Sequence, residues 1–319
     1  MLDVLIGSVA IPWNVTTSVF SGRPVDNDVW KTILIDFRLP KAITALLAGV
    51  ALSVSGLQMQ TLFRNPLAGP YVLGVTSGAS LGVALVLLVS SYSGYTLLSG
   101  ITGSMGVVSA AFAGGILVLL LILWISTKIQ NNTTILIIGL MFGQFANAIV
   151  GVLQYFSKAQ DLKGFIIWNM GSFGNVVWDE LLVLVPIVVI GLLIAYVLSK
   201  QLNILLLGEG YAKSMGVNVT ASRFSIIVST GLLAASVTAF CGPIAFLGLA
   251  IPHLVRSVFN TADHRILIPA AGLWGAMFSL LCDIVAQLPG ADETLPINAV
   301  TSIIGAPVVI WIIIKNRKY

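Results

Sequence analysis

The chain has 319 residues, of which 57% are hydrophobic and only 9% are charged. A soluble domain of this length carries about a quarter charged residues, so the composition excludes a protein whose whole surface faces water. The net charge of +4 comes without the interleaved basic and aromatic residues of a nucleic-acid surface. We predict an all-α integral membrane protein, with residues 1–319 forming a single transmembrane domain.

The uncharged segments have the length of transmembrane helices. They cover residues 42–63, 65–127, 129–157, 181–199, 224–252 and 294–314. A bilayer core of ~30 Å is crossed by about 20 helical residues, and lipid forces each span to satisfy its own backbone hydrogen bonds. Turn-forming residues at 90–96 and 99–103 divide the longest segment. The predicted spans are 42–63, 71–90, 104–126, 134–156, 180–199, 224–242, 244–259, 266–288 and 296–314.

The N-terminal residues 2–11 are also apolar, but they are too few to cross a bilayer. We expect them to be the end of a truncated first helix or a short interfacial segment, so that residues 1–37 combine this remnant with an external stretch. A secretory signal is disfavoured because no Lys or Arg precedes the apolar run. The expected bundle has about nine to ten transmembrane helices.

The basic residues predict the orientation of these spans. Alternating the loops puts ten Lys and Arg residues on one side, and the remaining six of the 16 on the other. Basic residues concentrate in cytoplasmic loops, so we expect the side that includes the C-terminus to be cytoplasmic. The ten are Arg64, Lys128, Lys200, Lys213, Arg223, Arg256, Arg265, Lys315, Arg317 and Lys318.

One distinctive loop, residues 203–222, lies on the predicted cytoplasmic side between two spans. It is too short and too polar to cross the membrane. Glu209 and Lys213 stand four residues apart, in the order that supports a short helix. Such a helix is a feature that a soluble motor subunit could grip, although a simple connector would also fit.

Two further blocks combine helix breakers with polar residues at membrane depth. Gln60 precedes Arg64-Asn65-Pro66 at the cytoplasmic end of one span, and Gly242-Pro243 precedes an apolar run that ends in Pro252-His253 and Arg256. Irregular backbone there must be covered by protein or line a cavity. Asp283 is an acid well inside a span, and both a functional role and a pairing role within the bundle remain open.

Together with Arg38-Leu-Pro-Lys41 and Leu295-Pro-Ile, these blocks resemble in order and spacing the FecCD-type permease family. That family imports ferric siderophores, haem and cobalamin through ATP-driven (type II ABC) importers. The resemblance covers residues 30–316. It implies a homodimer of ten-helix subunits, two cytoplasmic ATPase subunits that bind ATP-Mg, and an external substrate-binding protein. No cofactor or metal is expected on this chain itself.

The resemblance also implies roles for individual residues. Arg38 and Lys41 match residues that dock the external binding protein, and Asn132 and Thr133 fall where the family places its cytoplasmic gate. Gln287 stands where some relatives carry a third docking arginine. The ATPase-coupling positions implied within the 203–222 loop are Leu207, Gly208, Glu209, Ala212, Lys213 and Gly216.

The predicted span 134–156 carries a polar stripe. Gln144, Asn147, Gly151 and Gln154 lie within about 80° of one another at 100° per residue. A polar stripe on an apolar span belongs against water or another helix rather than lipid. Pathway lining and helix–helix contact both remain open.

Other functions fit less well. The chain has no Gly-Lys pair, which excludes a Walker A loop and leaves ATP hydrolysis to a partner. A self-contained transporter driven by protons or sodium would favour several membrane carboxylates, whereas this chain offers Asp283 alone. We expect a permease subunit without enzymatic activity, in the bacterial inner membrane, carrying an iron chelate or haem, with cobalamin as the alternative.

Overall fold

The computed structural model describes residues 2–5, 11–21, 28–89, 104–129, 131–287 and 294–316, and these residues contain helices and no strands. Within these ranges, six helices are long and apolar enough to cross a membrane. They are the continuous helix Asp28–Leu62, which ends in α4 (Leu39–Leu62), and α7 (Ser104–Lys128), α8 (Asn132–Phe156), α10 (Trp178–Val197), α13 (Val219–Cys241) and α15 (His264–Ala286).

Three shorter apolar segments account for the remaining predicted spans. They are η2 (Pro70–Leu73) with α5 (Val75–Ala84) and η3 (Leu85–Val89), then α14 (Leu247–Phe259), and α16 (Ile297–Asn316). All nine predicted spans therefore coincide with helical segments, and the all-α membrane fold is confirmed. The predicted turns at 90–96 and 99–103 lie outside the described residues, as do Met1 and residues 6–10 of the expected first-helix remnant.

The first span differs from its prediction at the N-terminal end. The helix begins at Asp28 rather than residue 42 and runs for 35 residues, which at 1.5 Å per residue is about 50 Å. Lys41 ended the uncharged run in the sequence and Arg38 and Asp36 precede it, but charged residues can continue a helix beyond the lipid core. A π-helical stretch, η1 (Ile33–Arg38), joins α3 (Asp28–Thr32) to α4.

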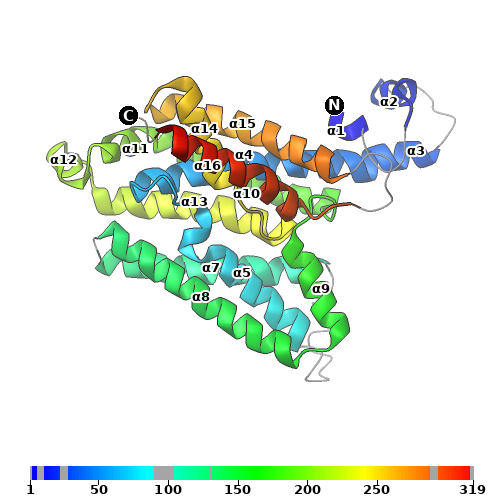
Figure 1. The fold of residues 1–319 in the computed structure, drawn as a ribbon, viewed down its shortest axis with the longest axis horizontal. Coiled ribbons are helices and arrows are strands. Elements are labelled where there is room, and N and C mark those ends of the chain that lie inside the picture. The colour runs from blue at the N-terminus through cyan, green and yellow to red at the C-terminus, as the bar shows by residue number, and fades with distance from the viewer. Residues whose placement is uncertain are drawn as a thin grey trace.

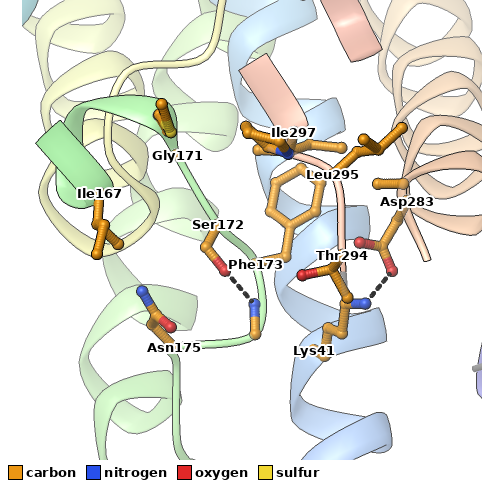
Figure 2. Close-up of a pocket in the computed structure, with 14 residues that line it drawn as sticks. Lys41, Ile167, Gly171, Ser172, Phe173, Asn175, Asp283, Thr294, Leu295 and Ile297 are labelled. Carbon is orange, nitrogen blue, oxygen red and sulfur yellow. Dashed lines mark hydrogen bonds and ion pairs between the residues drawn. The ribbon is translucent and has the colours of Figure 1, made fainter. Parts of the chain in front are cut away.

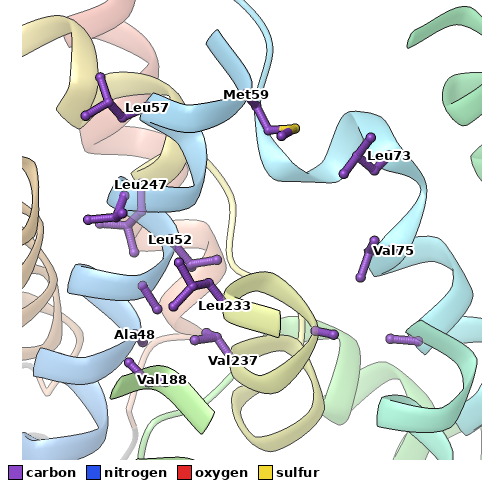
Figure 3. Packing of buried hydrophobic residues seen from close by; sticks show 14 of the residues in the cluster. Ala48, Leu52, Leu57, Met59, Leu73, Val75, Val188, Leu233, Val237 and Leu247 are labelled. Atoms are coloured by element: carbon purple, nitrogen blue, oxygen red, sulfur yellow. The ribbon is translucent and has the colours of Figure 1, made fainter. Parts of the chain in front are cut away.

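The bundle is built around two central helices, α4 and α13. Figure 1 shows α15, α14 and α16 grouped with α4, while α5, α7 and α8 form a second group on the other side of α13. Aliphatic side chains from these helices meet in the core drawn in Figure 3, among them Leu52 and Leu57 of α4, Leu233 of α13 and Leu247 of α14.

Glycines let α4 approach its neighbours closely. A β-carbon at Gly49 would overlap the backbone of Gly275 in α15, and one at Gly56 would overlap the backbone of Gly248 in α14. Helices in lipid gain their packing from such close contacts, because lipid tails are as apolar as the helix surfaces.

The predicted break at Gly242-Pro243 is an irregular segment at membrane depth. Helix α14 has only 13 residues, or about 20 Å, so it cannot span a ~30 Å core alone. The segment before it is covered by protein: the Ala245 N–H donates to Asn298 of α16 over 3.0 Å. Gly242 has a φ of +74° and packs against Gly171.

The two ends of the bundle carry different short helices. Figure 1 places α12 (Glu209–Ser214), α11 (Ser199–Leu206) and the C-terminal end of the described chain at one end. At the other end lie α1 (Leu2–Leu5), α2 (Trp13–Phe20) and α3, and α9 (Ala159–Met170) follows α8 on that side. The described loops that were predicted on opposite sides of the membrane therefore lie at opposite ends of the bundle, as alternating spans require.

Candidate functional site

The predicted coupling loop forms two short helices at the bundle end. Helices α11 and α12 are separated by Leu207 and Gly208, and Gly208 has a φ of +110°, in the region that favours glycine. Ala212 is the buried residue of α12. Leu207, Tyr211 and Met215 are 63%, 53% and 54% exposed. The short helix predicted from Glu209 and Lys213 is therefore present, with exposed apolar side chains on it and on either side, beside the exposed Lys213 and Ser214. Gly216 has a φ of +78° just after it.

Glu209 connects this helix to the neighbouring spans. Its Oε1 accepts hydrogen bonds from Asn132 Nδ2 over 2.8 Å and from Arg223 Nη2 over 2.7 Å. Asn132 Nδ2 also donates to the Leu62 carbonyl over 2.9 Å. The predicted coupling residue and the predicted gate residue are thus in direct contact, although they are 77 positions apart. Thr133 follows at the exposed N-terminus of α8.

The break after α4 lies beside the coupling loop. The Arg64 guanidinium donates to the Leu206 carbonyl of α11 over 3.2 Å, and Arg64 itself has a φ of 48°. Asn65 accepts the Leu67 N–H over 2.9 Å, and Pro66 lies exposed in the turn between them. The predicted helix break therefore joins α4 to the coupling loop.

A second polar cluster surrounds His264, which is fully buried at the start of α15. Thr61 Oγ1 lies 2.7 Å from His264 Nε2 and receives a hydrogen bond from Arg256 over 3.0 Å. Asn203 Oδ1 lies 2.7 Å from His264 Nδ1, and Asn203 Nδ2 donates to Asp263 over 2.6 Å. These bonds join α4, α11, α14 and α15.

The remaining motif residues lie close to this cluster. Gln60 Nε2 donates to the Leu249 carbonyl of α14 over 3.2 Å, and Pro252 is buried in the same helix. His253 is half-buried. The two motif blocks therefore meet in a contact between α4 and α14. Among the described residues, no group of three or more His, Cys, Asp or Glu could hold a metal ion.

The opposite end of the bundle contains a pocket of about 430 Å³. Figure 2 shows Lys41 and Asp283 in its wall, joined by an ion pair of 3.0 Å, with Phe173 and Thr294 nearby. Gln287 donates to Asp283 over 2.8 Å. Of the two roles left open for Asp283, the structure shows pairing within the bundle.

The two predicted docking residues therefore have partners inside the chain. Arg38 is 8% exposed and donates to the Leu5 carbonyl over 2.9 Å. The Lys41 side chain is 20% exposed. An acidic partner from outside would have to compete with Asp283 for Lys41, so the docking role stays a prediction. Gln287, which stands where some relatives have arginine, also donates to Asp3 over 3.1 Å.

The comparisons with known proteins agree on one family. The model of the FecCD transport family matches residues 1–315. The chain belongs to this family. It is 37% identical to the hemin transport system permease protein HmuU of Yersinia pestis over 311 residues, covering 96% of this chain and 87% of the relative. It is also 38% identical to the vitamin B12 import permease BtuC of Citrobacter koseri, over 88% of this chain and 82% of the relative.

Solved structures support the same fold. A metal-chelate type ABC transporter in an inward-facing conformation matches with a TM-score of 0.82 and 34% identity, covering 94% of this chain and 96% of that one. The structure of PsaBC from Streptococcus pneumoniae in complex with Fab matches with a TM-score of 0.61 at 18% identity, which bears on the fold alone. The predicted FecCD-type, ABC-permease fold is confirmed.

The polar stripe of this FecCD chain lies on the outside of the single subunit. Gln144, Asn147 and Gly151 are exposed, and Gln154 is partly exposed. Among the described residues, nothing lies within 4 Å of the place where a Gly151 β-carbon would stand. Contact between these helices of the same chain therefore does not explain the stripe. Pathway lining therefore stays a prediction, as does contact with a helix outside this chain.

Four residues that contribute to these clusters were not predicted from the sequence: Thr61, Asn203, Arg223 and His264. Arg223 was counted only as a basic residue of a cytoplasmic loop, yet its side chain is 4% exposed and paired with Glu209. The sequence did indicate that these side chains need partners, because burying a polar side chain near the end of a span is costly unless it is hydrogen-bonded. The partners themselves depend on helix crossings that the sequence does not display.

Proposed function

We propose that this chain is the transmembrane permease subunit of an ATP-driven importer that moves a metal chelate across the bacterial inner membrane. Membership of the FecCD family and the likeness to a metal-chelate type ABC transporter support this function. The observation that carries the proposal is the short helix α12 at one end of the bundle. The exposed Leu207, Tyr211 and Met215 offer an apolar contact to a soluble partner, and Glu209 contacts the start of α8.

The partners at α12 are ATPase subunits, one for each copy of the permease. This chain lacks the Gly-Lys pair of a Walker A loop, so ATP-Mg is bound and hydrolysed by those subunits, and the permease itself is not an enzyme. Basic residues gather at the end that carries α12, which is therefore the cytoplasmic end by the positive-inside rule. The C-terminus lies on this side.

Two copies of the chain form the translocation unit. The exposed stripe of Gln144, Asn147, Gly151 and Gln154 on α8 faces the space between the copies. Polar residues there provide a wetted path through the bilayer, which an apolar helix surface would not. Substrate moves along the two-fold axis, past Asn132 and Thr133 at the cytoplasmic end, by alternating access.

An external binding protein delivers the chelate at the opposite end. Its acidic residues pair with Lys41 and Arg38, in competition with the ion pair that Asp283 makes with Lys41. Lys41→Glu then weakens docking, and the loss shrinks with added salt because exposed charges are screened. Asp283→Asn, which removes the carboxylate paired with Lys41, has the opposite effect. Equal docking by both variants removes Lys41 from the interface.

Haem or another iron chelate is the proposed cargo, and HmuU, a hemin permease, is 37% identical over nearly the whole chain. Cobalamin is the second candidate, because the vitamin B12 permease BtuC is similar to the same degree. The described surface of the α8 stripe carries amides rather than fixed charges, so it does not discriminate between these cargoes.

The test is uptake into proteoliposomes that contain the permease with its cognate ATPase and binding protein. We expect uptake of haem or a ferric siderophore that requires both ATP and the binding protein. Preferential uptake of cobalamin selects the second cargo. Uptake that persists without ATP and follows a proton or sodium gradient contradicts the importer and favours a secondary transporter.

A further inference from the structure

We propose that Glu209 is a positioning residue that fastens the coupling helix α12 to the gate helix α8, so that the two move as one piece. The inference rests on the proposed function, since it concerns how a movement imposed by the ATPase reaches the gate. It assigns that transfer to one carboxylate oxygen and the two side chains that donate to it.

The geometry of the joint is tight. Oε1 of Glu209 receives Asn132 Nδ2 at 2.8 Å and Arg223 Nη2 at 2.7 Å. The second hydrogen of the Asn132 amide is used by the Leu62 carbonyl at 2.9 Å. Because an amide nitrogen has two hydrogens, both are engaged and the orientation of the Asn132 side chain is determined.

The joint also holds the turn in front of α8. Arg223 Nη1 donates to the Ile129 carbonyl over 3.3 Å, just after α7, while Asn132 is the first residue of α8. Hydrogen bonds to a charged donor or acceptor are roughly twice as strong as neutral ones. The Arg223 side chain is 4% exposed and that of Glu209 is 27% exposed, so solvent weakens this ion pair less than one at a free surface.

The other end of the coupling loop is attached to α15, and it shares the end of α4 with the joint. Arg64 after α4 donates to Leu206, and Asn203 contacts Asp263 and His264 at the start of α15. Between the two attachments stands Gly208, with a φ of +110°. A glycine at this point lets α12 change direction relative to α11, so a push on α12 is carried to α8 through Glu209 rather than into α11.

A local structural role is the competing explanation. If Glu209 only stabilises the loop, its removal lowers thermal stability but leaves the number of chelates moved per ATP unchanged. If it transmits movement, the ATPase still turns over while that ratio falls. The ratio therefore separates the two roles.

The experiment is a double-mutant cycle in the complete complex of permease, ATPase and binding protein in proteoliposomes. Glu209→Ala and Asn132→Ala should each lower the ratio of transported haem to hydrolysed ATP by about tenfold or more, corresponding to at least ~1.4 kcal/mol. The double variant should be no worse than either single variant, because both remove one joint. Thr127→Ala, at the exposed end of α7 and outside the coupling loop, is the control and should keep the wild-type ratio.

A charge swap provides the rescue. In the double variant Glu209→Arg with Arg223→Glu, the ion pair is restored in reverse, and the Asn132 amide can turn its oxygen toward the introduced guanidinium. The bond from residue 223 to the Ile129 carbonyl is lost, and the turned amide gives up its bond to the Leu62 carbonyl, so the rescue is partial. We expect the ratio to recover to at least half of the wild-type value, whereas Glu209→Arg alone should lose it.

Several results would overturn the joint. They are additive losses in the cycle, no rescue by the swap, or single variants that melt at lower temperature with an unchanged ratio. A wild-type complex that moves haem, siderophore and cobalamin without ATP would contradict the proposed function. If the wild-type complex transports with ATP and the variants keep its ratio of transported chelate to hydrolysed ATP, only the role of Glu209 is contradicted.

Discussion

Gly56 of α4 and Gly248 of α14 meet backbone to backbone, with the Gly248 carbonyl lying where a β-carbon of Gly56 would stand. This contact lies on the same two helices as the hydrogen bond from Gln60 to the Leu249 carbonyl. The glycines thus bring α14, which is too short to cross the bilayer by itself, against the central helix of the bundle.

Replacing Gly56 should therefore destabilise the permease. Gly56→Ala forces α4 and α14 apart, and overpacking of this kind costs about 1–3 kcal/mol. The measurement is thermal unfolding in detergent. Gly164→Ala in α9, where no atom of the described chain lies within 4 Å of the added carbon, is the control and should be neutral or slightly stabilising. Equal melting of the two variants would contradict the close contact.

Removing one partner of the Lys41–Asp283 ion pair should lower the stability of the permease more than replacing both partners by apolar residues. Asp283 is 4% exposed on its side chain, and Asp283→Leu leaves the Lys41 ammonium without its carboxylate, a loss of up to about 3 kcal/mol. The double variant Lys41→Met with Asp283→Leu should recover most of that stability, because it removes both charges. A double variant that melts as low as the single one would show that other contacts of Asp283 dominate.

Gly216 and Gly210 differ in one respect that can be tested. A β-carbon added to either glycine would have no atom of the described chain within 4 Å, but only Gly216 has a positive φ, of +78°. Strain in this region costs about 1–2 kcal/mol for a residue with a β-carbon. Gly216→Val should disturb the coupling loop and reduce transport per ATP, whereas Gly210→Ala, in α12, should keep it. Loss in both variants would point to contact with the ATPase rather than to backbone strain.

The stability contributed by Asp263 should depend on pH. Hydrogen bonds from the Arg265 N–H and from Asn203 lower the pKa of this carboxyl below its ordinary value. A carboxyl with a lowered pKa stabilises the folded state above its unfolded pKa of about 3.9, and the contribution is lost as pH falls through the folded pKa. The melting difference between wild type and Asp263→Asn should thus shrink from neutral pH to about pH 3. A constant difference would exclude the charge as its cause.

The polar stripe on α8 should lie near its copy in the homodimer. Cysteine introduced at Gly151 should link two subunits through bis-maleimide reagents of increasing length, with the shortest productive reagent measuring the separation. Cys241 and Cys282 are buried and should not interfere. Leu193→Cys on α10, where Leu193 is 60% exposed, is the control. Linkage at Leu193 and none at Gly151 would place the subunit interface elsewhere.

The positions of the spans could be read from the sequence because lipid acts on each segment separately. A stretch that lacks charges must close its own backbone hydrogen bonds as a helix wherever it lies in the bundle. Charged residues predicted the helix ends less well. The helix that continues into α4 starts at Asp28, fourteen residues before the predicted start. The edge of the lipid core determines where the apolar side chains end, but the helix can continue beyond it.

The partners of the polar side chains could not be read in this way. Glu209 was predicted to act in the coupling loop and Asn132 at the gate, but nothing in either local sequence shows that they touch. Arg38 and Lys41 looked like exposed cations, yet their neighbours are Leu5 and Asp283. Such contacts depend on where helices cross and at what depth each one ends.

The sequence by itself therefore determined the membrane class, the positions of the helical segments and the family. These follow from composition, from local hydropathy and from motifs at fixed spacing. Only the tertiary structure decided that α4 and α13 form the centre, that α14 is a short helix held by glycine contacts, and that Glu209 meets Asn132. The physical reason is that the arrangement of helices in lipid depends on close packing and on partners for buried polar groups. Both are properties of a pair of segments and not of one segment alone.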